Sequence, residues 1–194
     1  DKSRSDKTDD YRDFSNASSL LVRLELEGIS IGNRWAELAD LAETRTDDGC
    51  LTFADLHYMM ALVGDNRADA ATRLTARIAK DAPSDAEVSL VMRDPGVAVT
   101  QGLAAFSDGR YDDAFANLHA AHPRFQSMGG SHAQRDVFER VTIEAGLRAG
   151  SLDATQVLLE QRIAQRKGAV DDFAQTRLQM VCDARELQAR LAAE

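Results

Sequence analysis

The stretch from Gly102 to Ala121 constrains the fold more than any other part of the chain. Its two apolar helical segments meet at the turn Asp108–Arg110, which predicts a pair of antiparallel helices. Small residues that allow the helices to approach closely recur on both segments: Gly102, Ala105, Ala114 and Ala121. A single hairpin cannot bury its apolar faces, so it must stack on neighbouring hairpins. The stretch therefore predicts an all-α solenoid, built as a right-handed superhelix of helical hairpins.

Tyr111 is the residue that we expect to fix the geometry of this hairpin. It follows the turn glycine Gly109 by two residues and opens the second helix. Leu118 lies seven residues further on, on the same helix face. We therefore predict that the Tyr111 ring packs between the two helices and contacts no ligand.

Further helical segments alternate with short turns along the rest of the chain. Turn glycines recur at Gly28, Gly64, Gly109 and Gly150, spaced more widely than the ~34 residues of an ideal tetratricopeptide repeat. The other expected helices are about 19–26, 34–42, 53–63, 67–80, 85–92, 131–149, 152–166 and 170–192. Residues 1–12 are polar and charged, so we expect a tail or the remnant of an upstream region there. We expect residues 13–194 to form one degenerate repeat domain.

The charge balance argues against a nucleic-acid partner. The chain carries 32 acidic and 23 basic side chains, a formal net charge of −9, whereas phosphate binding needs a basic surface. The short basic run 162–167 lies on an expected helix, and we interpret it as a solvated face.

No apolar run approaches the ~20 residues of a membrane span, so no membrane partner is expected. Cys50 and Cys182 fit no metal or disulfide pattern, which favours free thiols and a cytoplasmic location.

Several stretches of the sequence carry a family resemblance. They are SLLVRLELEG at 19–28, GNRWAELA at 32–39, FADLHYMMA at 53–61, and GGSHAQRD at 129–136 followed by GLRAG at 146–150. Together they resemble the tetratricopeptide repeat protein 38 (StaR-like) family over roughly residues 14–180, the C-terminal half of a family member. The chain departs from the family at Val22, where a tryptophan is common, and at Asp65-Asn66. The resemblance implies an all-helical repeat fold, without established chemistry or catalytic residues.

The run Gly129–Asp136 is the best candidate for a binding site. Two glycines free the backbone, and Ser131 is a good N-cap for the helix that follows. The first turn of that helix then contains His132, Gln134 and Arg135. Free amides and the helix dipole favour an anion at such a position. Two interpretations stay open: an anion or partner site, or a structural corner in which Arg135 or Asp136 pairs with a neighbouring hairpin.

A second set of candidates comes from the repeat geometry. In such arrays the first helix of each hairpin lines the concave face, which would carry a binding groove. The residues that this places in the groove are Arg23, Tyr58, Phe106, Arg140 and Glu144. A salt bridge between repeats is the alternative for Arg23, and burial against the next hairpin is the alternative for Tyr58.

No sequence element predicts a cofactor, a metal or catalysis. His119 and His122 share a helix face, but zinc needs a third or fourth ligand, and no nucleophile, phosphate-loop or dinucleotide motif is present. We therefore expect a non-catalytic scaffold that binds a protein or peptide. The alternative is an enzyme or small-ligand-binding protein with an anion site at Gly129–Asp136.

The terminal helix carries an apolar stripe that would seal the solenoid or form a homodimer: Phe173, Leu178, Val181, Leu187 and Leu191.

Overall fold

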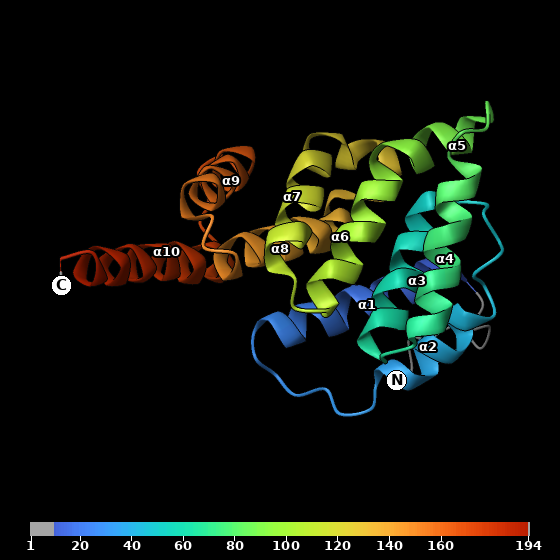
Figure 1. Cartoon of the computed structure of the whole chain (residues 1–194), viewed down its shortest axis with the longest axis horizontal. Helices are drawn as coiled ribbons and strands as arrows, with labels where there is room; N and C mark the ends of the chain where they lie inside the picture. Colours follow the sequence, from blue (N-terminus) through green and yellow to red (C-terminus); the bar gives the residue numbers. More distant parts are fainter. Residues whose placement is uncertain (1–9, 194) are drawn as a thin grey trace.

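The computed structural model describes residues 10–193, and within this range the chain is helical and contains no β-strand (Figure 1). The predicted all-α class is therefore confirmed. Helix α1 (Tyr11–Leu26) begins at Asp10, whose carboxylate accepts a hydrogen bond from the Arg12 amide at 2.9 Å. Tyr11 and Arg12, which we expected in the tail, thus belong to α1. Residues 1–9 of the predicted tail lie outside the described part.

The remaining helices follow in short succession. They are α2 (Trp35–Glu43), α3 (Thr52–Gly64), α4 (Ala68–Asp81), α5 (Glu87–Val91), α6 (Val97–Ser107), α7 (Tyr111–Ala121), α8 (His132–Arg148), α9 (Leu152–Gln165) and α10 (Asp172–Leu191). A bend over Met92–Gly96 joins α5 to α6, and a 3-10 helix over His122–Met128 joins α7 to α8. The expected helices agree with these bounds within two residues, except that α1 starts earlier and α6 begins at Val97, ahead of the predicted stretch Gly102–Ala121.

Three of the turns between helices share one backbone motif. Gly28, Gly109 and Gly150 have positive φ angles of 74°, 72° and 70°. After Gly109, the Arg110 amide donates to the Ala105 carbonyl at 2.9 Å. This hydrogen bond caps the end of α6, and the left-handed backbone reverses the chain. Glycine adopts this conformation without steric cost, which explains its place at these turns.

The turn after α3 differs from the prediction, because Gly64 is not its left-handed residue. Gly64 is still within α3, where it packs against the Trp35 ring. Asn66 takes the left-handed conformation instead, with φ of 57°, and the Arg67 amide donates to the Leu62 carbonyl at 2.8 Å. Asparagine is the residue other than glycine that most readily tolerates this backbone.

Helix α3 lies at the centre of the fold. Every residue from Thr52 to Leu62 is buried, and the helix packs against α1, α2, α4 and α6 (Figure 1). A helix that is buried on every side, as α3 is, needs neighbouring helices all around it.

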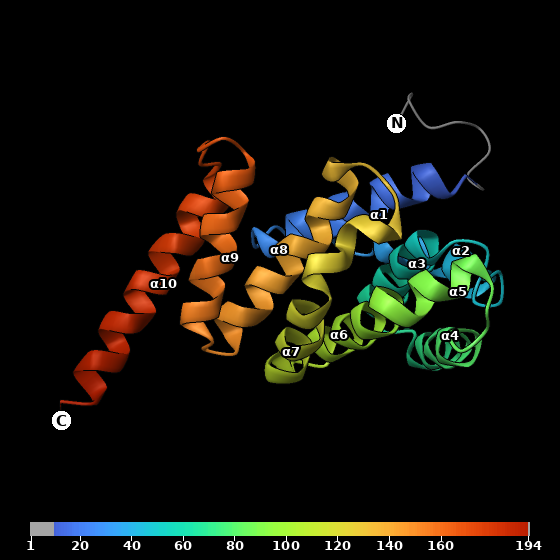
Figure 2. The same ribbon diagram turned by 90° about the horizontal axis from the view of Figure 1, so that it is seen from above.

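The other helices pack in chain order. Helix α6 packs on α7, α7 on α8, α8 on α9 and α9 on α10, whose C-terminal half projects from the body (Figure 2). Helix α1 crosses this order, because it packs against both α3 and α8. Helix α1 therefore fills the space between these two helices. No helix within residues 10–193 is long and apolar enough to cross a membrane.

The contact of α6 with α7 depends on Gly102. A Cβ atom at this position would lie 2.6 Å from Cγ of Leu118, well inside van der Waals contact. The absence of a side chain thus sets the distance between the two helices, as the sequence predicts.

Candidate functional site

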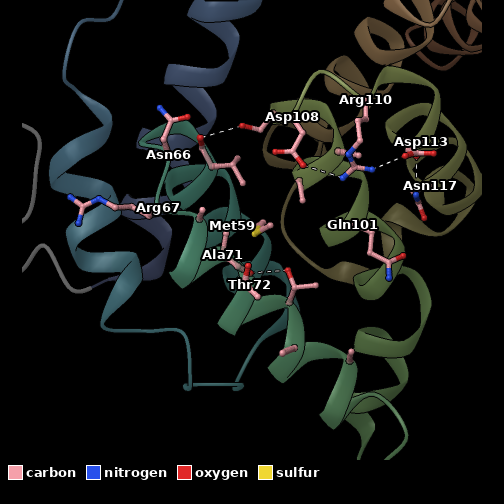
Figure 3. Close-up of a pocket in the computed structure, with 18 residues that line it drawn as sticks. Met59, Asn66, Arg67, Ala71, Thr72, Gln101, Asp108, Arg110, Asp113 and Asn117 are labelled. Carbon is pink, nitrogen blue, oxygen red and sulfur yellow. Dashed lines mark hydrogen bonds and ion pairs between the residues drawn. The ribbon is translucent and has the colours of Figure 1, made fainter.

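An open groove of about 730 Å³ runs between α4 on one side and α6 and α7 on the other (Figure 3). Its buried floor includes Met59, Ala71 and Ala105. One wall is a stripe of small side chains along α4, at Ala68, Ala71, Thr72, Thr75, Ala76 and Ala79. These positions follow helical spacing, so they share one face of α4. Small side chains leave room for an incoming chain to approach the helix backbone.

Neutral polar side chains add hydrogen-bonding groups to the groove. Thr75 donates to the Ala71 carbonyl at 2.8 Å, and Asn117 donates to the Asp113 carbonyl at 2.8 Å. Within residues 10–193, the side chains of Asn66, Thr72 and Gln101 make no hydrogen bond. Two amides and one hydroxyl are therefore available to a bound molecule as both donors and acceptors.

The charged residues at the rim are already paired. On the α7 side, Arg110 donates to Asp113 at 2.6 Å and to Asp108 at 3.1 Å (Figure 3). These carboxylates raise the pKa of Arg110 above its usual value. At the start of α4, Arg67 makes three similar ion pairs, to Asp40, Glu43 and Asp65. The groove therefore presents a surface that is close to neutral, although the whole chain is acidic.

The glycine-rich corner before α8 uses its polar groups internally. Ser131 accepts from the Gln134 amide at 3.3 Å, and the Gln134 side chain accepts from the Ser131 amide at 2.8 Å. This reciprocal capping box satisfies the helix end. Arg135 donates to the carbonyls of Gly129, at 3.0 Å, and Gly130, while His132 is exposed. This geometry matches the structural interpretation of the corner, since Ser131, Gln134 and Arg135 already have partners.

Asp136, the last residue of the same run, joins α8 to α9. It accepts hydrogen bonds from Arg162, from Arg166 at 2.6 Å and from Arg140 at 2.7 Å. Burial alone would raise the pKa of Asp136, but the hydrogen bond from Arg162 and the charges of Arg162 and Arg140 lower it. The Arg162 side chain is 0% exposed. The basic run 162–167 is thus not a solvated face throughout, because its first residue neutralises a buried carboxylate.

The start of α10 completes this ion network. Phe173 is buried, and its ring lies under the guanidinium groups of Arg140 and Arg177, each 4.3 Å from the ring centroid. Asp171 caps α10 by accepting from the Ala174 amide at 2.9 Å and also pairs with Arg162 at 2.7 Å. These contacts fasten the α9–α10 pair to α8.

Four of the five expected groove residues lie in contacts between helices. Arg23 donates to the Ala133 carbonyl at 2.6 Å and lies 3.6 Å from Asp136. The others are Arg140 and Glu144, which belong to the ion network, and Tyr58, which is 7% exposed and packs edge-on against Phe14. These four side chains already have partners within the molecule, and their role in binding a partner stays a prediction. Phe106 lines a second pocket, which lies between α1, α3, α6 and α8.

The sequence patterns did not single out the groove residues, because repeat geometry points to an inner, concave face. The signal was nevertheless present on α4, where alanine and threonine recur at 68, 71, 72, 75, 76 and 79 beside the buried stripe of Leu74 and Ile78. Gln101 and Asn117 had no local signal, since their meeting with α4 depends on how separate hairpins stack.

The terminal helix divides its apolar stripe between two environments. Phe173 and Val181 are buried within the molecule, whereas Leu187 and Leu191 are 58% and 64% exposed. A homodimer through α10 stays a prediction. Among the residues that the structure describes, no group of three or more His, Cys, Asp or Glu side chains is placed to hold a metal ion.

Comparison with known proteins leaves the resemblance untested. No family model matches the chain, and no solved structure matches it. Membership of the tetratricopeptide repeat protein 38 family therefore stays a prediction from the residues quoted above.

Proposed function

We propose that this chain is a non-catalytic scaffold of tetratricopeptide-type hairpins that binds an extended protein segment in the groove between α4 and α6–α7. The observation that carries the proposal is the groove itself, which is open, has an apolar floor and a wall of small side chains, and is bordered by neutral polar side chains. The repeated glycine turns and the chain-order packing of α6 to α10 support the repeat-type fold.

The chemistry of the groove fits recognition of a peptide backbone. An extended backbone presents an N–H and a C=O group at each residue, and amide and hydroxyl side chains such as Gln101 and Thr72 can both donate to and accept from them. The α4 stripe from Ala68 to Ala79 is roughly 16 Å long, which accommodates roughly five extended residues.

The charges of the groove also indicate the kind of segment. Arg67 and Arg110 are held by carboxylates of the same chain, so neither needs a charged partner. A segment with small or uncharged side chains toward the groove is therefore the expected occupant, and specificity would come mainly from shape and backbone hydrogen bonds.

Selection from a random peptide library, followed by titration of the selected peptide, tests this function. Replacing Thr72 and Gln101 together by Ala should weaken binding by about tenfold, or about 1.4 kcal/mol, because two backbone partners are lost. The melting temperature should stay near that of the wild type, since both side chains are exposed and unbonded.

A matched chemical change in the ligand completes the test. N-methylation of the selected peptide removes backbone donors while its side chains stay the same, and it should weaken binding to the wild type more than to the double variant. Equal loss for both proteins would mean that the groove side chains do not contact the peptide backbone, and the proposal would fail.

A further inference from the structure

A second pocket, of about 530 Å³, lies where the C-terminal ends of α1, α3 and α6 meet α8. Its volume is within the range of small-molecule sites, ~300–1,000 Å³. Its walls are mainly apolar and aromatic and include Val22, Trp35, Leu103, Phe106, Tyr111 and Val141. The pocket adjoins the groove and shares Val63, Asn66 and Ser107 with it.

Glu25 provides a negative charge at this pocket. Its carboxylate accepts a hydrogen bond from the Trp35 indole at 3.0 Å. Within residues 10–193, no lysine or arginine forms an ion pair with Glu25. Glu25 is exposed, but partial desolvation at the pocket raises the pKa of its carboxyl, and the Trp35 hydrogen bond opposes this shift. A carboxylate that has lost part of its hydration and has no cation beside it favours the approach of a positive charge.

Arg148 does not supply that charge. Its guanidinium lies over the rings of Phe106 and Tyr111, at 5.1 and 5.2 Å from their centroids. It donates to the Tyr111 hydroxyl at 3.1 Å and is neutralised by Glu144 at 2.9 Å. Arg148 therefore fixes the aromatic wall in place. Tyr111 is half-buried in this wall, with its ring 5.5 Å from that of Phe106, so it lines a pocket as well as joining two helices.

We propose that this pocket binds an organic ammonium ion, with the charged nitrogen at Glu25 and a hydrocarbon body against the apolar wall. The carboxylate supplies the counter-charge, and the Trp35 hydrogen bond fixes its position. Val22, Leu103 and Val141 supply apolar surface for the carbon chain. A free amine and the lysine side chain of a segment bound in the groove share this chemistry, and the experiment distinguishes them.

Trp35 is the chain's single tryptophan, so its fluorescence reports directly on the pocket. The full chain is titrated with hexylammonium, with Nα-acetyl-lysine amide and with neutral hexanol. We expect a saturable emission change with at least one of the two ammonium probes, at concentrations about tenfold or more below those that hexanol requires. A response to hexylammonium alone assigns a free amine, a response to the lysine derivative alone assigns a protein side chain, and a response to both supports the shared chemistry.

Two variants make the test specific for charge. Glu25→Gln keeps an acceptor for the Trp35 indole but removes the charge, and it should weaken ammonium binding by about tenfold with an unchanged melting temperature. Glu160→Gln, at an exposed carboxylate on α9, is the matched control and should bind as the wild type does. No saturable response to either ammonium probe, equal responses to hexylammonium and hexanol, or full affinity in Glu25→Gln would overturn the proposal. None of these outcomes depends on peptide binding in the groove, so the proposed function is tested separately.

Discussion

At the residue scale, the structure concentrates its buried charge on a few side chains. Asp136 receives hydrogen bonds from arginines of both α8 and α9, and Arg162 in turn reaches Asp171 at the start of α10. Buried ions are costly to remove from water, so each must keep its partners. This explains why a residue that looks like part of a surface run is one of the largest fully buried side chains.

Replacing Arg162 by Met tests the importance of this network. The change keeps the length of an apolar side chain but leaves Asp136 and Asp171 short of a cation, so the free energy of unfolding should fall by about 3–5 kcal/mol. Urea denaturation measures the loss. Arg110→Met, at an exposed ion pair, is the control and should change the free energy of unfolding far less, because exposed pairs contribute little to stability. Similar stability of Arg162→Met and the wild type would show that the network does not hold α9 and α10.

His57 should make the fold sensitive to acid. Its Nδ1 atom lies 2.9 Å from the Ser18 hydroxyl, and its ring packs edge-on against Phe53 and Phe138. Burial, with a smaller contribution from the charge of Arg23, lowers the pKa of His57 from 6.5 to about 3. Between these two values the unfolded chain binds a proton that the folded chain does not.

The free energy of unfolding should therefore decrease as the pH falls below about 6.5, with a slope that approaches about 1.4 kcal/mol per pH unit from this residue. Chemical denaturation at several values between pH 5 and 7 measures the slope, in a range where most carboxylates stay ionised. His57→Gln should reduce it, whereas His132→Gln, at an exposed position, should leave it as in the wild type. An unchanged slope in His57→Gln would mean that the imidazole is protonated in the fold.

At the element scale, close approach between helices decides the geometry of the hairpins. The Leu118 side chain of α7 fills the space that a side chain at Gly102 of α6 would need. Helix α1 packs between α3 and α8. The first of these contacts follows from small residues at helical spacing and was predictable from the sequence. The contact of α1 with α3 and α8 was not predictable, because the local sequence of α1 carries no pattern that indicates which later helices it packs against.

Gly102→Ala should lower the free energy of unfolding by about 1–3 kcal/mol, because the added methyl group collides with Leu118. In a Leu118→Ala background the collision is absent, and the same substitution should become neutral or stabilising, since alanine favours a helix by about 1 kcal/mol over glycine. Thermal or urea unfolding of the four proteins measures this coupling. Equal effects of Gly102→Ala in the two backgrounds would show that α6 and α7 do not meet at this point.

At the scale of the whole molecule, local pattern predicted the helices and tertiary pairing determined the sites. Turn glycines, caps and 3.6-residue periodicity give the helix bounds, and Ser131 caps α8 as expected. The residues of the ion network and the groove were harder to predict from the sequence. The Asp136–Arg162 ion pair, and the groove that contains Thr72 and Gln101, bring together segments that are distant in the chain. Such meetings depend on the order and angle of stacking, which single-residue patterns do not encode.

Peptide binding in the groove is tested most directly by the affinity of a selected, fluorescently labelled peptide for a protein whose groove has been filled. Ala76 is exposed in the groove wall on α4, whereas Ala116 is exposed on α7 and is not part of the groove lining. Fluorescence anisotropy should show that Ala76→Trp binds the peptide about tenfold or more weakly than the wild type, and that Ala116→Trp binds it equally well. Equal affinity of all three proteins would contradict the account, because the peptide would then bind elsewhere on the molecule.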